Sequence, residues 1–341
     1  MQDKILEGFR LSPQQEYLWP LNAGWAQCAI MLTGVLDKET LRNTLRELVN
    51  RHEILRTTFH RPHGLGTPFQ VINEDSTPLW SDSVARSEQL EQMFAAQARE
   101  SFDYENGPLM KASLLALSAE THVLLLTLPA LCADARTLEN ICRQLSRASD
   151  DDAMQYVDFA TWQHDLLESD EAEEAAVYWR QVHPPLPIEK LPLSLRPTTS
   201  TNFDVSPVFH LEQVEQLANT YDVSPAEWLY ACWQVLLWRL TGETDLVTGE
   251  VLDGRSHEEL HDSLGPFART LPIHCHFETD FRFTDILKQV KQATRDASRR
   301  QNYFTPALLP VPFPPPIPAP FPRLSSAMGA SKVLALVFDA L

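Results

Sequence analysis

The chain has 341 residues, of which 44% are apolar, and this length accommodates about two domains with packed cores. Its formal net charge of −18 argues against a general nucleic-acid-binding protein, which needs a basic face, and against docking on an anionic membrane. The five cysteines show no C-x-x-C spacing, which favours free thiols in a reducing compartment over a disulfide framework. Neither a signal peptide nor a bilayer-spanning apolar run is recognisable, so we expect a cytoplasmic protein.

The first part of the chain, residues 1–180, alternates predicted helices and strands. Asp37 is placed to cap a helix that carries a leucine every three or four residues. A near-continuous apolar run from His122 to Leu128 predicts a strand that is buried on both faces. Asp134 follows this strand and can cap the next helix, so the segment predicts a strand, a short turn and a helix in succession.

Two proline-rich stretches divide the rest of the chain. Residues 181–200 hold five prolines and predict an extended linker. Residues 201–341 form a second predicted part, in which Ser224 and Glu227 make a capping box at the start of a helix. Its other predicted elements are strands at 245–252 and 271–277 and a helix at 283–297. Residues 306–322 hold nine prolines, which predict an extended or disordered segment that is neither helix nor central strand.

Two pairs of histidines are candidate metal ligands. His257 and His261 match the H-E-x-x-H zinc-protease pattern, which needs two histidines one turn apart on a stable helix. Flanking glycines leave barely two turns there, so a solvated polar loop is the favoured interpretation. His274 and His276 share one face of a predicted strand, but no third ligand stands at a useful spacing. We therefore predict that neither pair forms a metal site.

A cysteine and two arginine clusters are further candidates for a functional role. Cys132 lies between a predicted strand and a helix N-terminus, a place where the pKa of a thiol is lowered. No histidine lies nearby in the sequence to act as its base, so a buried free cysteine is favoured over a nucleophile. The arginine clusters can dock acidic partners, although a solvated helix face is the favoured interpretation of each. They comprise Arg136, Arg143 and Arg147 on one helix and Arg295, Arg299 and Arg300 on another.

Six short motifs follow one another along residues 9–305. They are Leu11-Ser-Pro-Gln-Gln15, Arg51 to Phe59, Phe102 to Leu109, Tyr156 to Gln163, Asp245 to Arg255, and Leu264 to Pro272. Any one of these motifs is a weak signal. Together and in this order, they resemble the condensation domains of nonribosomal peptide synthetases.

The resemblance implies an α/β fold of two lobes, each like chloramphenicol acetyltransferase, which meet in a V. A complete second lobe would continue past Leu341, so the second lobe is expected to be incomplete here. A tunnel between the lobes admits two carrier proteins, each bringing an acyl group on a phosphopantetheine thioester. The family joins the two groups by attack of an amine on a thioester carbonyl. The resemblance implies no directly bound cofactor besides the phosphopantetheine arm of the partner carriers.

The family's His-His-x-x-x-Asp-Gly signature is degenerate in this chain. The first histidine position is Pro129, the second, which orients or deprotonates the amine, is Ala130, and the glycine position is Ala135. The aspartate remains as Asp134, and the resemblance gives it a structural role. In the family this aspartate pairs with an arginine of the second lobe, which matches Arg255 and predicts a contact that closes the lobes.

A positioned acid or base is typically worth about 10²–10⁴ in rate, so we expect conventional condensation to be lost or severely reduced. Family members that lost the histidines serve as platforms. The resemblance therefore predicts a non-catalytic scaffold for carrier proteins, for an adjacent adenylation domain or for a tailoring enzyme. The alternative is an active amide-forming domain in which positioning of the reactants replaces the histidine base, with assistance from Asp134, from Cys132 as a tunnel residue or from a histidine of the tunnel.

Overall fold

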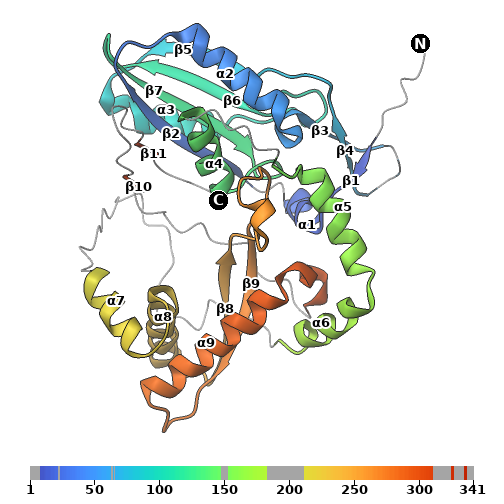
Figure 1. Cartoon of the computed structure of the whole chain (residues 1–341), viewed down its shortest axis with the longest axis vertical. Coiled ribbons are helices and arrows are strands. Elements are labelled where there is room, and N and C mark those ends of the chain that lie inside the picture. The colour runs from blue at the N-terminus through green and yellow to red at the C-terminus, as the bar shows by residue number, and fades with distance from the viewer. Residues whose placement is uncertain are drawn as a thin grey trace. The chain divides into compact units, whose positions relative to one another are not determined.

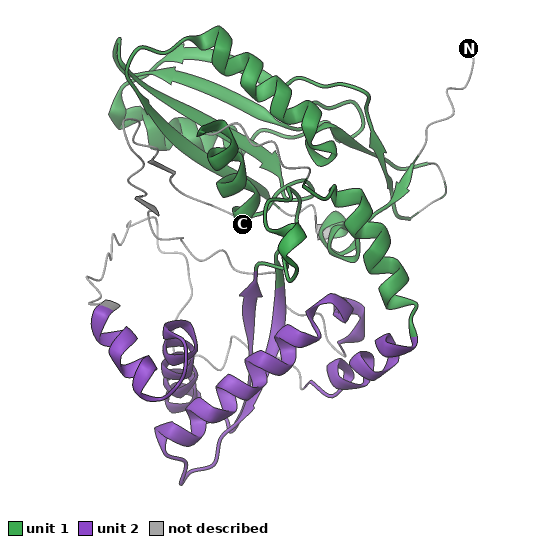
Figure 2. Ribbon diagram, in the orientation of Figure 1, with its two compact units in different colours: residues 1–169, 253–269, 316–341 green, residues 170–252, 270–315 purple. Residues whose placement is uncertain are grey.

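A computed structural model describes most of the chain and divides it into two compact units (Figure 2). The described residues are 8–21, 24–62, 64, 66–146, 153–182, 211–309, 324–325 and 334–335. Unit 1 comprises residues 1–169, 253–269 and 316–341, and unit 2 comprises residues 170–252 and 270–315. These units differ from the predicted division at residues 181–200, chiefly because residues 253–269 belong to unit 1. The predicted linker from residue 183 onward lies outside the described residues.

The main sheet of unit 1 has four strands. Its order is β2-β7-β6-β5, with β2 spanning Trp25–Thr33, β7 Thr121–Pro129, β6 Lys111–Ala116 and β5 Leu79–Val84. β7 is antiparallel to both of its neighbours, and β5 pairs with β6 in parallel. The predicted strand at residues 122–128 is therefore a central strand.

Helices cover both faces of this sheet (Figure 1). On one face, alternate residues of β7 such as Leu124 and Leu126 pack with apolar side chains of α2 (Lys38–Arg51) and α4 (Ala135–Ser146). On the other face, Leu125 packs with Phe94 of α3 (Leu90–Ala98). Because successive side chains of a strand point to opposite faces, this arrangement explains the continuous apolar run and confirms that β7 is buried on both faces.

Both predicted helix caps of this region are present. The Asp37 carboxylate accepts hydrogen bonds from the backbone N–H groups of Glu39 and Thr40 at 3.0 and 3.2 Å and begins α2. The Asp134 carboxylate accepts one from the N–H of Thr137 at 2.7 Å and begins α4. These bonds satisfy donors that the first turn of a helix leaves without an intrahelical acceptor.

A small antiparallel sheet and two further helices complete the described part of unit 1. The sheet has the order β1-β4-β3, with β1 at Phe9–Arg10, β4 at Phe69–Ile72 and β3 at Thr57–His60. The helices are α1 (Pro13–Leu21) and α5 (Tyr156–Leu167), with single 3₁₀ turns η1 (Glu53–Arg56), η2 (Ser87–Gln89) and η4 (Glu258–Leu260).

In the described part of unit 2, three helices and a two-stranded sheet share one apolar core, and a fourth helix, α7, packs against α8. The helices are α6 (Asp170–Arg180), α7 (Leu211–Thr220), α8 (Pro225–Thr241) and α9 (Phe283–Arg299), and the strands are β8 (Asp245–Leu252) and β9 (Arg269–His276). α8 begins with the predicted capping box of Ser224 and Glu227 and ends at Gly242, whose φ of 71° is left-handed. The predicted strands and helices of this part are therefore confirmed.

The second proline-rich stretch differs from its prediction at its start. Pro306–Leu308 forms the 3₁₀ turn η6, which follows another short turn, η5, at Gln301–Tyr303. Proline fits there because the first position of a helical turn has no intrahelical partner for an N–H group. Residues 310–322 lie outside the described residues, while two short strands, β10 (Leu324–Ser325) and β11 (Leu334–Ala335), pair antiparallel.

Candidate functional site

Residues 129–135 form the turn between β7 and α4, and backbone hydrogen bonds hold it in place. Pro129 ends β7 and pairs with Trp25 of β2. The N–H of Ala130 donates to the Gly24 carbonyl at 3.2 Å, and the N–H of Cys132 donates to the Pro129 carbonyl at 2.9 Å. The side chains at 129 and 130 carry no titratable group, so the turn offers neither an acid nor a base at these two positions.

The Asp134 carboxylate ends this turn and is held by an arginine. Its two oxygens accept hydrogen bonds from the two terminal nitrogens of Arg255 at 3.0 and 3.1 Å. One oxygen also accepts the N–H of Ala268 at 2.9 Å, and the other caps α4. The Arg255 side chain is fully buried and that of Asp134 is 8% exposed. The result is a bidentate, nearly dry ion pair, the strongest geometry for this kind of contact.

Arg255 uses its remaining donors on the chain around it. Its guanidinium donates to the Ser263 and Gly265 carbonyls at 3.2 and 3.3 Å, and to a carboxylate oxygen of Asp253 at 2.6 Å. It also lies 4.4 Å from the centre of the Phe267 ring. Burial disfavours the charge, but the two carboxylates outweigh it, so the pKa of Arg255 is raised. The group therefore stays charged and ties residues 253–268 into one loop.

This ion pair lies entirely within unit 1, because residues 253–269 belong to that unit. The predicted pair of Asp134 and Arg255 is therefore present, while its predicted role in closing the lobes stays a prediction. Within unit 1, the pair fastens the segment that follows β8 onto the start of α4. The same segment places Leu260, Leu264 and Phe267 in the core of unit 1, which is the physical reason for its assignment there.

Two polar residues of α4 also hold this segment and were missed in the sequence. The hydroxyl of Thr137 donates to the Gly265 carbonyl at 2.8 Å and accepts the Gly265 N–H at 3.0 Å. The Asn140 side chain donates to the His261 carbonyl at 2.8 Å. Both residues are fully buried. Their contacts could have been suspected from the sequence, because both are polar residues on the apolar face of the helix, next to Leu138.

The tyrosine of the fourth motif links the same segment to the first motif. The Tyr156 hydroxyl donates to the Pro266 carbonyl at 3.2 Å and lies 2.7 Å from the Ser12 hydroxyl. Burial raises the pKa of Tyr156 well above its ordinary value. Gln15, also of the first motif, donates to the Leu131 carbonyl of the turn at 3.0 Å. Motifs far apart in the sequence thus converge on one turn.

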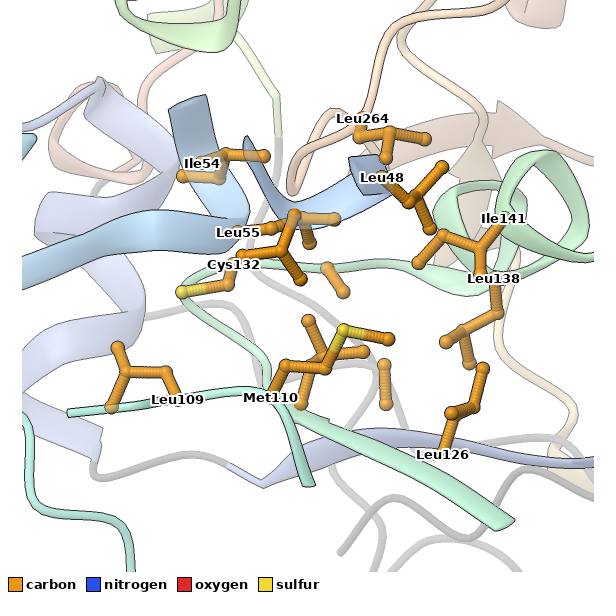
Figure 3. Close-up of a cluster of buried hydrophobic side chains, with 14 of the residues drawn as sticks. Leu48, Ile54, Leu55, Leu109, Met110, Leu126, Cys132, Leu138, Ile141 and Leu264 are labelled. Carbon is orange, nitrogen blue, oxygen red and sulfur yellow. The ribbon is translucent and has the colours of Figure 1, made fainter. Parts of the chain in front are cut away.

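Cys132 belongs to the core of unit 1 and is not a tunnel residue in this structure. Its side chain is fully buried, and Figure 3 shows it among Leu55, Leu109 and Met110. Desolvation raises the pKa of the thiol far above its ordinary value. A nucleophile needs access and a thiolate, and Cys132 has neither. The apolar side chains of the turn and of α4 exclude water from the thiol. This burial outweighs the lowering of the thiol pKa that is expected at a helix N-terminus.

The histidine pairs do not form a metal site. His257 and His261 flank the single 3₁₀ turn η4, so they lack the α-helix that the zinc-protease pattern requires. His274 and His276 both contact one carboxylate oxygen of Asp245, at 3.1 and 2.8 Å. Among the described residues, no group of three or more histidine, cysteine or acidic side chains is placed to hold a metal ion.

Four of the five arginines that the structure describes in the two clusters lie beside a carboxylate. Arg136 pairs with Glu139, and Arg143 pairs with Asp262 at 2.8 Å. Arg295 lies 3.9 Å from Glu227, and Arg300 pairs with Asp296. Arg147 lies outside the described residues. These contacts favour structural roles over a basic docking face.

A surface pocket of about 540 Å³ on unit 1 is lined by residues 55–58, 71–77 and 106–109. In the described part of the chain, no helix has the length and apolar character needed to cross a membrane.

Comparison with known proteins identifies the family. Residues 11–308 match the condensation domain family. This chain belongs to that family. It is 31% identical over 292 residues to tyrocidine synthase 2 of Brevibacillus parabrevis, a match that covers 80% of this chain and 8% of that protein. The condensation-domain chain is thus similar to a small part of a much longer synthase.

Solved structures share the fold and confirm the predicted α/β class, with lobes like those of chloramphenicol acetyltransferase. The condensation domain of the monacolin K polyketide synthase MokA matches with a TM-score of 0.77 and 22% identity, over 88% of this chain and 75% of that one. The X-domain of teicoplanin biosynthesis matches with a TM-score of 0.75 and 25% identity, over 91% and 75%. The X-domain has also been solved in complex with OxyB of the same biosynthesis, and that structure matches with a TM-score of 0.72.

Proposed function

We propose that this condensation-family domain does not form amide bonds and acts as a binding platform within a nonribosomal peptide synthetase. The observation that supports this proposal is the turn at 129–135. Pro129 and Ala130 occupy the two histidine positions, while the backbone bonds of the turn and the Asp134–Arg255 pair are kept. The architecture around the missing base is intact, which argues for a retained structural role.

Neither Cys132 nor Asp134, the two reactive side chains of the turn, can replace the missing base. Cys132 is buried and protonated, and both carboxylate oxygens of Asp134 already accept hydrogen bonds from Arg255, Thr137 and Ala268. A general base must reach the proton that it removes, within hydrogen-bond distance or through one water. The alternative of an active domain would then depend on positioning of the two carriers or on a base from another part of the chain.

The likeness to the X-domain supports the platform role. At 25% identity over 91% of this chain, the X-domain is a relative in sequence as well as in fold, and it binds a second protein, OxyB. We propose partners of the same kind here: a tailoring enzyme, the neighbouring carrier proteins with their phosphopantetheine arms, or the adjacent adenylation domain. The domain itself would bind no cofactor, and it would work in the cytoplasm with its synthetase.

A single-turnover assay with two loaded carrier proteins tests the loss of catalysis. The carriers are those that flank this domain in its synthetase, and the measured quantity is the amide product at each time. We expect the wild-type domain to form no more product than carriers alone. The matched variants are Ala130→His and the double variant Pro129→His with Ala130→His. Amide formation by the wild type above the background of carriers alone would overturn the proposal in favour of catalysis by positioning.

A binding experiment tests the platform role separately. The purified domain is titrated by calorimetry with three proposed partners, which are a carrier protein and an adenylation domain of its synthetase and a tailoring enzyme that acts on the carrier-bound amino acid. We expect at least one of them to bind with a stoichiometry of one. If none binds, the platform role fails even if catalysis is absent.

A further inference from the structure

One helix of unit 2 exposes a row of large apolar side chains. The helix is α8, in which Glu227 and Arg239 are the only charged residues among 17. The α8 row consists of four side chains that are each 40–48% exposed, namely Leu229, Trp233, Leu236 and Leu240. A helix with so few charges is normally buried on all sides, and an exposed apolar patch marks a contact surface. The α8 row is therefore a candidate contact surface for a protein partner.

The α8 row faces away from the core of unit 2. Its members follow one another at steps of four, three and four residues, which keeps them on one side of the helix. Ala231 and Trp238, on the opposite side of the helix, belong to the core. Steps of three and four are also the spacing of the apolar positions in a coiled coil, where two helices pack side by side. The spacing therefore indicates that the partner is another α-helix.

The α8 row is symmetric about its own centre. The steps are four, three and four residues from either end, and a leucine stands at both ends. Two antiparallel copies of α8 therefore match layer by layer. In the outer layers, Leu229 contacts Leu240 of the second copy. In the inner layers, Trp233 contacts Leu236 of the second copy. A twofold interface requires this kind of self-complementarity.

We propose that the α8 row is a dimer interface, in which α8 packs antiparallel on α8 of a second copy of this chain. The charges of α8 favour this orientation, because its first turn is acidic through Glu227 and its last turn is basic through Arg239. An antiparallel pair places each basic end beside the acidic end of the other copy and opposes the two helix dipoles, whereas a parallel pair places like charges side by side. The chain has a net charge of −18, so two copies can meet only at a patch without acidic side chains, and the α8 row has none.

The neighbouring helix adds apolar surface to the α8 row. α7 packs against α8 (Figure 1), and its Leu217 and Tyr221 are 46% and 44% exposed. The centres of the Tyr221 ring and of the Trp228 ring, at the start of α8, are 5.4 Å apart. A stable interface buries about 800 Å² on each partner, which is more than one row of side chains provides, so we expect α7 to border the contact. The dimer contact is independent of the proposed platform role, because it uses no residue of the turn at 129–135.

The mass of the full chain in solution tests the interface. Light scattering after size-exclusion chromatography should give a mass twice that of one chain at a concentration of about 100 µM. Leu236→Glu and Trp233→Glu should each raise the dissociation constant about a hundredfold, because twofold symmetry places the new carboxylate in two apolar layers. The matched control is Val177→Glu, at a position on α6 of the same unit that is 47% exposed, and it should leave the constant unchanged. Circular dichroism checks that each variant is folded.

Engineered cysteines test the antiparallel orientation. Leu229→Cys and Leu240→Cys are prepared as separate proteins, each with Cys232→Ser to remove the exposed cysteine of α8. Under a mild oxidant, an equal mixture of the two proteins should form a disulfide between positions 229 and 240. Neither protein alone should do so, because the two copies of one position lie roughly 16 Å apart along the antiparallel helices.

Three results would overturn the proposal. The first is a mass of one chain at about 100 µM, even if an added amphipathic peptide then binds to the α8 row, because the row would serve another partner. The second is a dimer that both Leu236→Glu and Trp233→Glu leave unchanged. The third is a disulfide in the separate cysteine proteins but not between the two in the mixture, which would show parallel helices.

Discussion

Replacing Asp134 with alanine tests how much the buried ion pair stabilises unit 1. The variant leaves the fully buried guanidinium of Arg255 with Asp253, whose side chain is 48% exposed, as its remaining carboxylate. It also removes the cap of α4 and the acceptor of the Ala268 N–H. Unpairing one member of a buried ion pair costs about 3–5 kcal/mol, and losing a capping side chain costs about 1 kcal/mol.

We expect Asp134→Ala to lower the free energy of unfolding of unit 1 by about 3–5 kcal/mol in total, because Asp253 offsets part of the loss. Denaturation with guanidinium, followed by tryptophan fluorescence, measures this change. Hydrogen exchange of the amides at 253–269 gives a local value, which matters because two compact units need not unfold together.

Two control variants separate the contributions. Asp134→Asn keeps an acceptor for the helix cap but removes the charge, so it isolates the ion pair. Asp253→Ala removes the exposed partner of Arg255 and should cost less than about 1 kcal/mol. If Asp134→Ala costs no more than Asp253→Ala, or if exchange at 253–269 is unchanged, the argument that this pair fastens the segment is refuted.

Two other variants test local features of unit 1. Gly254→Ala should destabilise the protein by more than about 2 kcal/mol, because position 254 has a φ of +78° and an added Cβ would lie 2.0 Å from the Phe267 carbonyl oxygen. The control is Gly34→Ala, at a position with a φ of +106° and open space around it, and thermal melting should show a clearly larger loss of stability for the variant at 254. Hydrogen bonds from the Thr40 side chain and backbone lower the pKa of Asp37. The stabilisation of the folded state by this cap is therefore complete above the ordinary aspartate pKa of about 4 and is lost as the pH falls through the lowered pKa. The difference in melting temperature between wild type and Asp37→Ala should therefore shrink below pH 4, and a constant difference would contradict the assignment.

Local sequence signals determined most of the elements of this protein. The caps Asp37 and Asp134 begin helices where predicted, because a capping side chain and its N–H partners lie within three residues of each other. The apolar run at 122–128 marked a strand buried on both faces, because burial acts on every residue of a central strand. The order of the motifs predicts that Pro129 and Ala130 stand where the family has its histidine pair, and the lack of a titratable group in either side chain is a property of the sequence alone.

Only the tertiary structure decided which compact unit each segment joins and what each side chain faces. Residues 253–269 follow β8 in the chain, yet Leu264 packs in the core of unit 1 and Arg255 binds Asp134, 121 positions away. The burial of Cys132 and its contact with the core could not be inferred from its place before a helix. Contacts between residues so far apart carry no local pattern, because they are set by the packing of whole elements.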